Sequence, residues 1–412
     1  MRARPRLRTA LGHRQHEAAE DARTRSWTTR SSPATGTRLA WRTAFFMQCR
    51  CLPSLITGSL AFRLFTEGDE LYDAMLASIA SARRRIRLES YILAPDEIGW
   101  RFAEALAAKT EQGIEVLAHL DAAGSLFWSS QRLERFLRQR GVRVKWFHRW
   151  RWRDPLRYNR RDHRKLLVVD DHTVYLGGFN LHRESSRRVV GSVRWRDSHV
   201  RVEGQLAAQA AELFDRFWHG DRRWQSSVTG AATGIVLSNR SRACRHQFHC
   251  LFGTVVAAAR QRVDLTTPYF VPDRATQAAL VRAARSGAAV GLLVPGKTDV
   301  PVARWAARAA YAPLLRAGVR IYEYRPRVLH AKTLSVDGEW AVIGTSNIDY
   351  RSFFLNYEVN LVARDPGLCT ALERQFALDL AHATEITAGG WARRPWPDRL
   401  CELIGWAARR WL

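Results

Sequence analysis

The chain has 412 residues, of which 46% are hydrophobic and 10% aromatic, enough for two ordinary domains with buried cores. Its formal net charge of +26 predicts polyanionic partners, which include nucleic acids, anionic membranes and phosphorylated ligands. No apolar stretch reaches the length of about 18 residues that a transmembrane helix requires, so any membrane contact is expected to be peripheral.

Basic residues are concentrated in two segments. Residues 1–57 carry 11 Arg and three acidic residues without a hydrophobic period, which predicts a disordered basic tail. Residues 129–165 carry 14 Arg or Lys residues, with Trp146, Trp150 and Trp152 among them. This composition suits an anionic lipid surface, a nucleic acid or a solvated loop, and by itself does not choose among them.

Patterned sequence begins near residue 60. The first half predicts helices over 68–82, 101–112 and 132–140, and strands over 85–93, 115–120 and 142–147. After a polar linker at 220–233, the second half predicts helices over 243–260, 275–286 and 302–317, and strands over 262–267, 289–294 and 320–324. Alternating helices and strands predict an α/β fold with a largely parallel sheet in each half.

An internal repeat is the strongest feature of the sequence. Five polar or special residues recur with a constant separation of 167 residues: His163, Lys165, Asp170, Gly177 and Asn180 return as His330, Lys332, Asp337, Gly344 and Asn347. Each copy predicts a strand, a turn and a second strand, over 163–169 and 174–176 and over 330–336 and 341–343. A repeat of this length indicates two similar domains.

The repeated residues suit phosphodiester chemistry. Alternate residues of a strand face one side, so the His and Lys of each copy are expected to share a face. An imidazole can attack phosphorus or carry a proton. The ammonium of Lys165 or Lys332 and the carboxamide of Asn180 or Asn347 can hold non-bridging phosphate oxygens. Two copies would supply this chemistry without a metal or another cofactor.

These motifs resemble the phospholipase D superfamily, whose signature is His-x-Lys-x4-Asp followed by Gly-Gly/Ser and Asn. Other segments between about residues 60 and 385 are similar to the bacterial cardiolipin synthases, in particular to the B-type branch that lacks transmembrane helices. These segments are Gly68 to Leu71, Glu89 to Tyr91, Asp121 with Gly124 and Ser125, Trp195 to His199, Thr267 to Pro272, and Leu355 to Glu358.

The resemblance implies two similar phospholipase D-like domains, each a mixed, mainly parallel sheet flanked by helices, related by a pseudo-twofold axis. It also implies a two-step reaction through a phosphohistidine, with His163 as nucleophile and His330 as acid and base. The substrate implied is phosphatidylglycerol, joined to a second copy with release of glycerol. It places Asp170 and Asp337 with the catalytic residues, although Asp at such turns is equally expected for structural reasons.

Each catalytic imidazole needs an acceptor for its second nitrogen. Asp197 lies 34 residues after His163, and Glu358 lies 28 residues after His330. We expect each carboxylate to orient the histidine of its own half, the alternative being a surface ion pair with one of the many Arg residues.

The expected domains are a basic tail (1–57), two phospholipase D-like domains (58–219 and 234–385) joined by a linker (220–233), and a C-terminal amphipathic helix (386–412). In that helix Leu400, Leu403, Ile404, Ala407 and Trp411 recur at helical spacing. The stripe is compatible with lying in lipid headgroups and with docking on the protein core.

The expected function is therefore cardiolipin synthesis at the cytoplasmic side of the cell membrane, by a peripherally bound enzyme. Hydrolysis of phospholipids, or transfer to another alcohol, is the alternative within the same chemistry. A nuclease is disfavoured by the lipid-branch segments, so nucleic acid is not expected as a partner. Two intact motifs disfavour a non-catalytic binding protein, and the sequence leaves the oligomeric state open.

Overall fold

The computed structural model describes residues 55–126, 130–148, 159–221, 232–239 and 242–409. Nearly all of the expected tail, most of the linker and residues 149–158 of the basic segment lie outside these ranges, and so does Trp411. The described residues belong to one compact unit, Cys49–Leu412.

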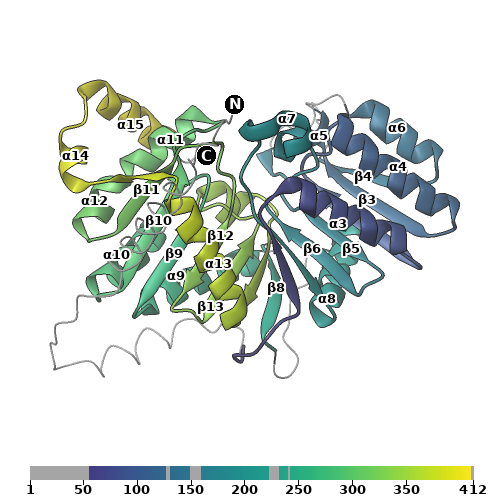
Figure 1. The fold of residues 1–412 in the computed structure, drawn as a ribbon, viewed down its shortest axis with the longest axis horizontal. Helices are drawn as coiled ribbons and strands as arrows, with labels where there is room; N and C mark the ends of the chain where they lie inside the picture. The colour runs from purple at the N-terminus through teal and green to yellow at the C-terminus, as the bar shows by residue number, and fades with distance from the viewer. Residues whose placement is uncertain (1–54, 127–129, 149–158, 222–231, 240–241, 410–412) are drawn as a thin grey trace, which may run out of the picture. The chain divides into compact units, whose positions relative to one another are not determined.

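The first half is built on a seven-stranded sheet with the order β1-β7-β6-β5-β2-β3-β4 (Figure 1). Its strands are β1 (Phe62–Phe65), β2 (Arg85–Ser90), β3 (Glu115–Asp121), β4 (Arg143–Phe147), β5 (Leu166–Val169), β6 (Thr173–Gly177) and β7 (His199–Glu203). Its α-helices are α3 (Gly68–Ser81), α4 (Glu97–Glu111), α5 (Ala122–Leu126), α6 (Gln131–Gln139), α7 (Arg187–Val190) and α8 (Gln205–Trp218).

The second half is built on an eight-stranded sheet with the order β15-β11-β10-β9-β12-β13-β14-β8. Its strands are β8 (Gly234–Ser238), β9 (Arg262–Thr266), β10 (Ala289–Pro295), β11 (Arg320–Tyr324), β12 (Thr333–Val336), β13 (Trp340–Gly344), β14 (Val359–Ala363) and β15 (Ala383–Ile386). Its α-helices are α9 (Arg242–Ala258), α10 (Arg274–Arg285), α11 (Pro301–Ala309), α12 (Tyr311–Arg316), α13 (Pro366–Leu380), α14 (Ala388–Ala392) and α15 (Trp396–Ala408).

The two similar α/β halves with mixed sheets are confirmed, but the expectation of mainly parallel sheets is wrong. Only β2-β3-β4 and β9-β10-β11 are parallel, and the other pairings in both sheets are antiparallel. The reason lies in the repeated unit, since β5-β6 and β12-β13 are joined by tight turns, and a tight turn can connect only antiparallel neighbours.

Two predicted helices are divided. The C-terminal helix expected over 386–412 forms α14 and α15, and its first residue belongs to β15. The segment over 302–317 forms α11 and α12, which meet at Ala310. Pro313 has no N–H to donate to the carbonyl of Ala309, so a continuous helix would lose a hydrogen bond at this point.

Three hydrophobic cores hold the unit together. One lies between the first sheet and α3, α4 and α6, and another between the second sheet and α9, α10 and α12. The third joins the halves, because it combines side chains of α8 and α13 with inward-facing residues of both sheets. It brings β6 of the first half beside β13 and β14 of the second. Within the described residues, no helix is both long and apolar enough to cross a bilayer.

Candidate active site

The two His-x-Lys segments lie where the halves meet. Each segment precedes its strand, so the expected strands over 163–169 and 330–336 are shorter, and β5 and β12 begin at Leu166 and Thr333. Register pairs Leu166 with Glu89 near the carboxyl end of β2, which places the first segment at that edge of the sheet. The second segment lies at the corresponding edge, where Thr333 pairs with Thr266 of β9.

Backbone contacts bind each catalytic segment to the opposite half. The His163 N–H donates to the Tyr357 carbonyl at 2.9 Å, and the His330 N–H donates to the Arg196 carbonyl at 2.7 Å. Both belong to short parallel bridges that link the residue before each histidine to the other half. The pseudo-twofold relation is therefore present in the main chain itself.

The orienting carboxylates are exchanged between the halves. Nδ1 of His163 lies 3.0 Å from Oε2 of Glu358, and Nδ1 of His330 lies 2.5 Å from Oδ2 of Asp197. The expected pairing of each carboxylate with the histidine of its own half is therefore wrong. The bridge at Tyr357 places the next residue, Glu358, beside His163 of the other half. The bridge at residue 196 places Asp197 beside His330 in the same way. With Nδ1–H donated to a carboxylate, each Nε2 keeps a lone pair for chemistry.

The surroundings of the two carboxylates differ. Glu358 is fully buried and accepts a hydrogen bond from Oγ1 of Thr345. Asp197 accepts one from the N–H of Ser198 at 2.7 Å. A side chain at Gly178, the position equivalent to Thr345, would put its Cβ 2.0 Å from Oδ1 of Asp197. Gly178, the second Gly of the first motif, therefore leaves room for Asp197. At the equivalent position of the second motif, Thr345 instead donates a hydrogen bond to Glu358.

The two lysines lie in the same electrostatic cluster as the histidines. Nζ of Lys165 donates to the carbonyl of His163 at 2.7 Å, and Nζ of Lys332 donates to that of His330. Burial, with smaller contributions from the neighbouring ammonium, lowers the pKa of Lys165 to about 7, and burial lowers that of Lys332 to about 8. Burial also lowers the pKa of both histidines, and each ammonium contributes to the lowering at both rings.

The two asparagines lie at the same edge of the sheets, just beyond the ends of β6 and β13. Next to each, a parallel bridge joins Leu181 to Leu93 and Ile348 to Phe270. Asn180 and Asn347 are 3% and 5% exposed. The carboxamide of Asn180 accepts a hydrogen bond from the N–H of Ile92 at 3.3 Å, which fixes its orientation. Both asparagines therefore lie at the edge of the sheets where the His-x-Lys segments also lie.

Asp170 and Asp337 are not at this edge. They lie past the opposite ends of β5 and β12, in the left-handed backbone conformation with φ of 54°. The carboxylate of Asp170 accepts the N–H groups of residues 83, 84 and 85, and that of Asp337 those of residues 260, 261 and 262, at 2.7–3.0 Å. Their placement among the catalytic residues is therefore corrected, because both carboxylates fix the chain entering β2 or β9.

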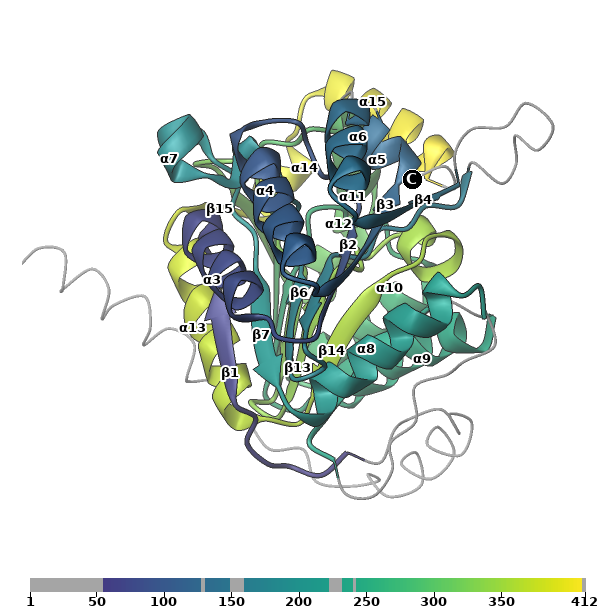
Figure 2. The same ribbon diagram turned by 90° about the vertical axis from the view of Figure 1, so that its right-hand side faces the viewer.

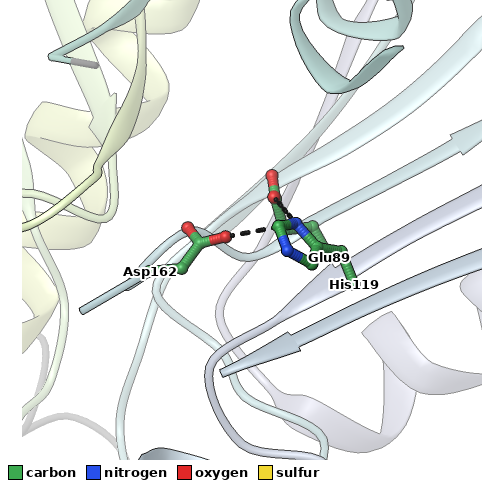
Figure 3. Close-up of side chains that lie close together, drawn as sticks. All are labelled: Glu89, His119 and Asp162. Carbon is green, nitrogen blue, oxygen red and sulfur yellow. Dashed lines mark hydrogen bonds and ion pairs between the residues drawn. The ribbon is translucent and has the colours of Figure 1, made fainter. Parts of the chain in front are cut away.

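A second buried polar group supports the first catalytic segment. Figure 3 shows Glu89, His119 and Asp162, whose ligand atoms all lie within 4.8 Å of one another, a spacing that could hold a metal ion. Arg164 already bridges the two carboxylates, at 2.8 Å from Glu89 and 2.9 Å from Asp162. Burial by itself would raise the pKa of Asp162, but the Arg164 guanidinium lowers it. Arg164 therefore provides the positive charge that a metal ion would otherwise bring to these carboxylates. The arrangement fits an ion-pair network better than a metal site.

Aromatic rings lie against both histidines, and they were not among the expected site residues. The ring of Tyr91 meets that of His163 at 5.0 Å between centroids, and the ring of Trp195 meets that of His330 at 5.3 Å. The signal for them in the sequence was that Tyr91 and Trp195 both fall in segments similar to the bacterial cardiolipin synthases. With the crossed carboxylates, these rings surround two histidines contributed by two similar halves, each of which carries the His-x-Lys-x4-Asp signature that resembles the phospholipase D superfamily.

Comparisons with known proteins agree with this class. The family model described as "Cardiolipin synthase, PLD-like domain" matches residues 75–218 and 254–380. The chain is 33% identical to a cardiolipin synthase of Oceanobacillus iheyensis over 333 residues, covering 79% of this chain and 69% of that protein. It is 32% identical to a cardiolipin synthase of Staphylococcus aureus over 353 residues, covering 83% and 71%. The chain therefore belongs to the cardiolipin synthase family.

A solved structure shows the same fold. The phosphatidylserine synthase of Haemophilus influenzae Rd KW20 superposes with a TM-score of 0.68, covering 89% of this chain and 99% of that one. Sequence identity is 14%, so the likeness concerns the fold alone.

Proposed function

We propose that the protein joins two phosphatidylglycerol molecules into cardiolipin and releases glycerol, through a phosphohistidine on His163. The observation that supports this proposal is the pair of crossed dyads, His163 with Glu358 and His330 with Asp197. Each dyad leaves one Nε2 available, so one imidazole can bond to phosphorus while the other moves a proton.

In the first step, Nε2 of His163 attacks the phosphorus of the first phosphatidylglycerol. The bond from phosphorus to the headgroup glycerol oxygen breaks, and protonated His330 gives that oxygen its proton, so free glycerol leaves. In the second step, now neutral His330 takes a proton from the headgroup hydroxyl of a second phosphatidylglycerol. That oxygen attacks phosphorus, the phosphorus–nitrogen bond breaks, and cardiolipin and the starting enzyme are formed. His330 is protonated before the first step and again after the second, and Asp197 stabilises this imidazolium.

The phosphate is held by the lysines and asparagines of both motifs. Lys165 and Lys332 neutralise charge on the non-bridging oxygens, and Asn180 and Asn347 donate hydrogen bonds to them. The lowered lysine pKa values fit this role, because a bound phosphodiester anion would return both ammonium groups to their charged form. The carboxamides need no proton exchange and serve throughout the cycle.

The same proposal places the enzyme on the cytoplasmic side of the cell membrane, bound peripherally to its anionic substrate. The net charge of +26 supports attraction to a phosphatidylglycerol surface. Nucleic acid is not a partner in this scheme.

The test is a lipid product assay with purified protein and vesicles that contain labelled phosphatidylglycerol. Wild type and His382→Ala, a variant of an exposed histidine, should form cardiolipin and glycerol, and His163→Ala should form neither. Phosphatidic acid as the sole product would replace the proposal with a hydrolase. If no lipid is converted, the proposal fails and DNA cleavage becomes the next assay.

A further inference from the structure

Helix α15 packs on the protein through a face that carries a glycine and a charged residue instead of large apolar side chains. Gly405 lies so close to α11 that an added Cβ would come within 2.3 Å of the Ala306 nitrogen. Glu402 is 5% exposed and forms ion pairs with Arg394 at 2.9 Å and Arg308 at 3.4 Å. A glycine and a carboxylate therefore hold the helix in place, and its large apolar side chains are not used for docking on the core.

The opposite face of α15 is apolar and exposed. On this face Leu400, Leu403 and Ile404 are 50%, 61% and 48% exposed and Trp396 is 74% exposed, and on its flank Trp406 is 52% exposed. Among the described residues nine large hydrophobic side chains are exposed, and five of these belong to this single helix. At 100° per residue, positions 396, 400, 403, 404 and 407 form one stripe directly opposite Glu402 and Gly405. Such a concentrated patch marks an interaction surface.

The charges around the stripe match an anionic partner. Arg399 lies on the flank of the stripe, and Arg409, the residue that ends the helix, has its guanidinium 3.7 Å from the centroid of the Trp406 ring. Arg beside Trp next to a leucine-rich face is the composition of helices that lie in lipid headgroups. The net charge of +26 adds a long-range attraction of the same sign.

The helix also lies at the end of the unit where the His-x-Lys segments lie. Its support, α11, follows β10 through a loop in which Asp299 accepts a hydrogen bond from the Tyr269 hydroxyl at 2.8 Å. The Asp299 carboxylate is near enough to Lys332 to contribute, with a sign opposite to that of burial, to the pKa of Lys332. In Figures 1 and 2, α15 lies at the same end of the unit as α5, which begins at the carboxyl end of β3.

We infer that the exposed face of α15 docks the enzyme on an anionic phospholipid bilayer and presents the catalytic cluster to the lipid surface. This inference rests on the proposed function for the choice of phosphatidylglycerol as the anionic lipid. The aliphatic and indole side chains enter the headgroup boundary, and the arginines pair with phosphates. The tight contact at Gly405 and the ion pairs of Glu402 keep the helix rigid in this orientation.

The test measures cosedimentation of the full chain with vesicles of phosphatidylglycerol and phosphatidylcholine. The variant Leu400→Ser/Leu403→Ser/Ile404→Ser should bind about tenfold or more weakly, since three aliphatic side chains no longer enter the membrane. The matched control Ile56→Ser/Leu378→Ser changes two exposed hydrophobic residues elsewhere, each 49% exposed, and should bind like wild type. Equal binding by the triple variant and wild type would overturn the inference.

Two further measurements separate the remaining outcomes. Sedimentation velocity without lipid should give the same mass for wild type and the triple variant. A wild-type dimer that the variant dissociates would make the face a contact between two copies and would overturn the inference. Turnover of a short-chain, monomeric phosphatidylglycerol tests the proposed function separately. If this turnover is absent while vesicle binding still depends on α15, the proposed reaction fails and the docking surface stands.

Discussion

The two halves present their histidines in the same way but support them differently. Around the first segment, Glu89, His119, Asp162 and Arg164 form a buried polar network. The strand registers and the 167-residue repeat place Thr266, Leu293, Leu329 and Ala331 at the equivalent positions of the second half. All four of these side chains are buried, and three are aliphatic.

The comparison distinguishes the residues that both halves share from the residues that support the His-x-Lys segment of the first half alone. Both halves keep the histidine, the lysine and a carboxylate from the opposite half, and these are the groups that the proposed function uses. The interior beneath them is filled by charges in one half and by hydrocarbon in the other. Well-packed hydrophobic residues can replace a buried ion-pair network without loss of stability, whereas removing one partner of the network is strongly destabilising.

The largest expected effect separates the roles of the two histidines. His163→Ala and His330→Ala should each lower turnover by about 10³-fold or more, as removal of a nucleophile or its proton carrier does in other enzymes. Only His330→Ala should still form the covalent phosphohistidine, detectable after a brief reaction with ³²P-labelled phosphatidylglycerol and a denaturing quench. Label retained by His163→Ala instead would reverse the assigned roles.

The crossed carboxylates provide the next test. Asp197→Asn and Glu358→Gln should each lower turnover by about 10²- to 10⁴-fold, because the imidazole loses its orientation and the stabilisation of its charged form. Of His163 and His330, each substitution should lower the pKa only of the one in the other half, measured by NMR titration of isotope-labelled histidine. The resonances would be assigned with the two His→Ala variants. A shift of His163 in Asp197→Asn would contradict the crossed pairing.

The buried network can be exchanged for the residues of the other half. Arg164→Ala should reduce the free energy of unfolding by about 3–5 kcal/mol, because it leaves two buried carboxylates without their cation. The quadruple variant Glu89→Thr/His119→Leu/Asp162→Leu/Arg164→Ala, which copies the second half, should recover most of that loss in urea denaturation. If the quadruple variant is less stable than Arg164→Ala, the two interiors are not interchangeable.

Asp170 and Asp337 should behave alike because their geometry is the same in both halves. Asp170→Asn and Asp337→Asn should each cost about 1–3 kcal/mol of unfolding free energy, since each weakens three hydrogen bonds from backbone N–H groups. Turnover per folded molecule should stay near that of wild type. A loss of turnover at full stability would return either residue to the catalytic group.

A further prediction concerns pH. Lys165 and Lys332 are charged below their pKa values of about 7 and about 8 and become neutral above them. Affinity for a soluble phosphodiester such as diethyl phosphate, a monoanion throughout this range, should therefore fall as pH rises from 6 to 9. Each lost ammonium should contribute up to about tenfold per pH unit. In calorimetric titrations, Lys165→Gln should remove the fall near pH 7 and Lys332→Gln the fall near pH 8, and a flat wild-type profile would contradict both values.

From the sequence alone we could predict the α/β class, the twofold repeat, and the histidines, lysines and asparagines that lie at one edge of the sheets. These follow from local hydrophobic period and from residue types at constant spacing, which a single chain displays directly. Most helix and strand positions could be predicted as well. The antiparallel pairing of most strands could not, because strand order depends on contacts between distant segments.

The tertiary structure was needed to show which carboxylate pairs with which histidine. Spacing along the chain suggested partners within each half, but parallel bridges at residues 162 and 196 join the halves and exchange Asp197 and Glu358. It also showed that Asp170 lies at the opposite end of β5 from the histidine, and that the apolar stripe of α15 faces away from the core. A sequence pattern shows that a face is apolar or that a carboxylate is needed, whereas packing between remote elements decides what each of them meets.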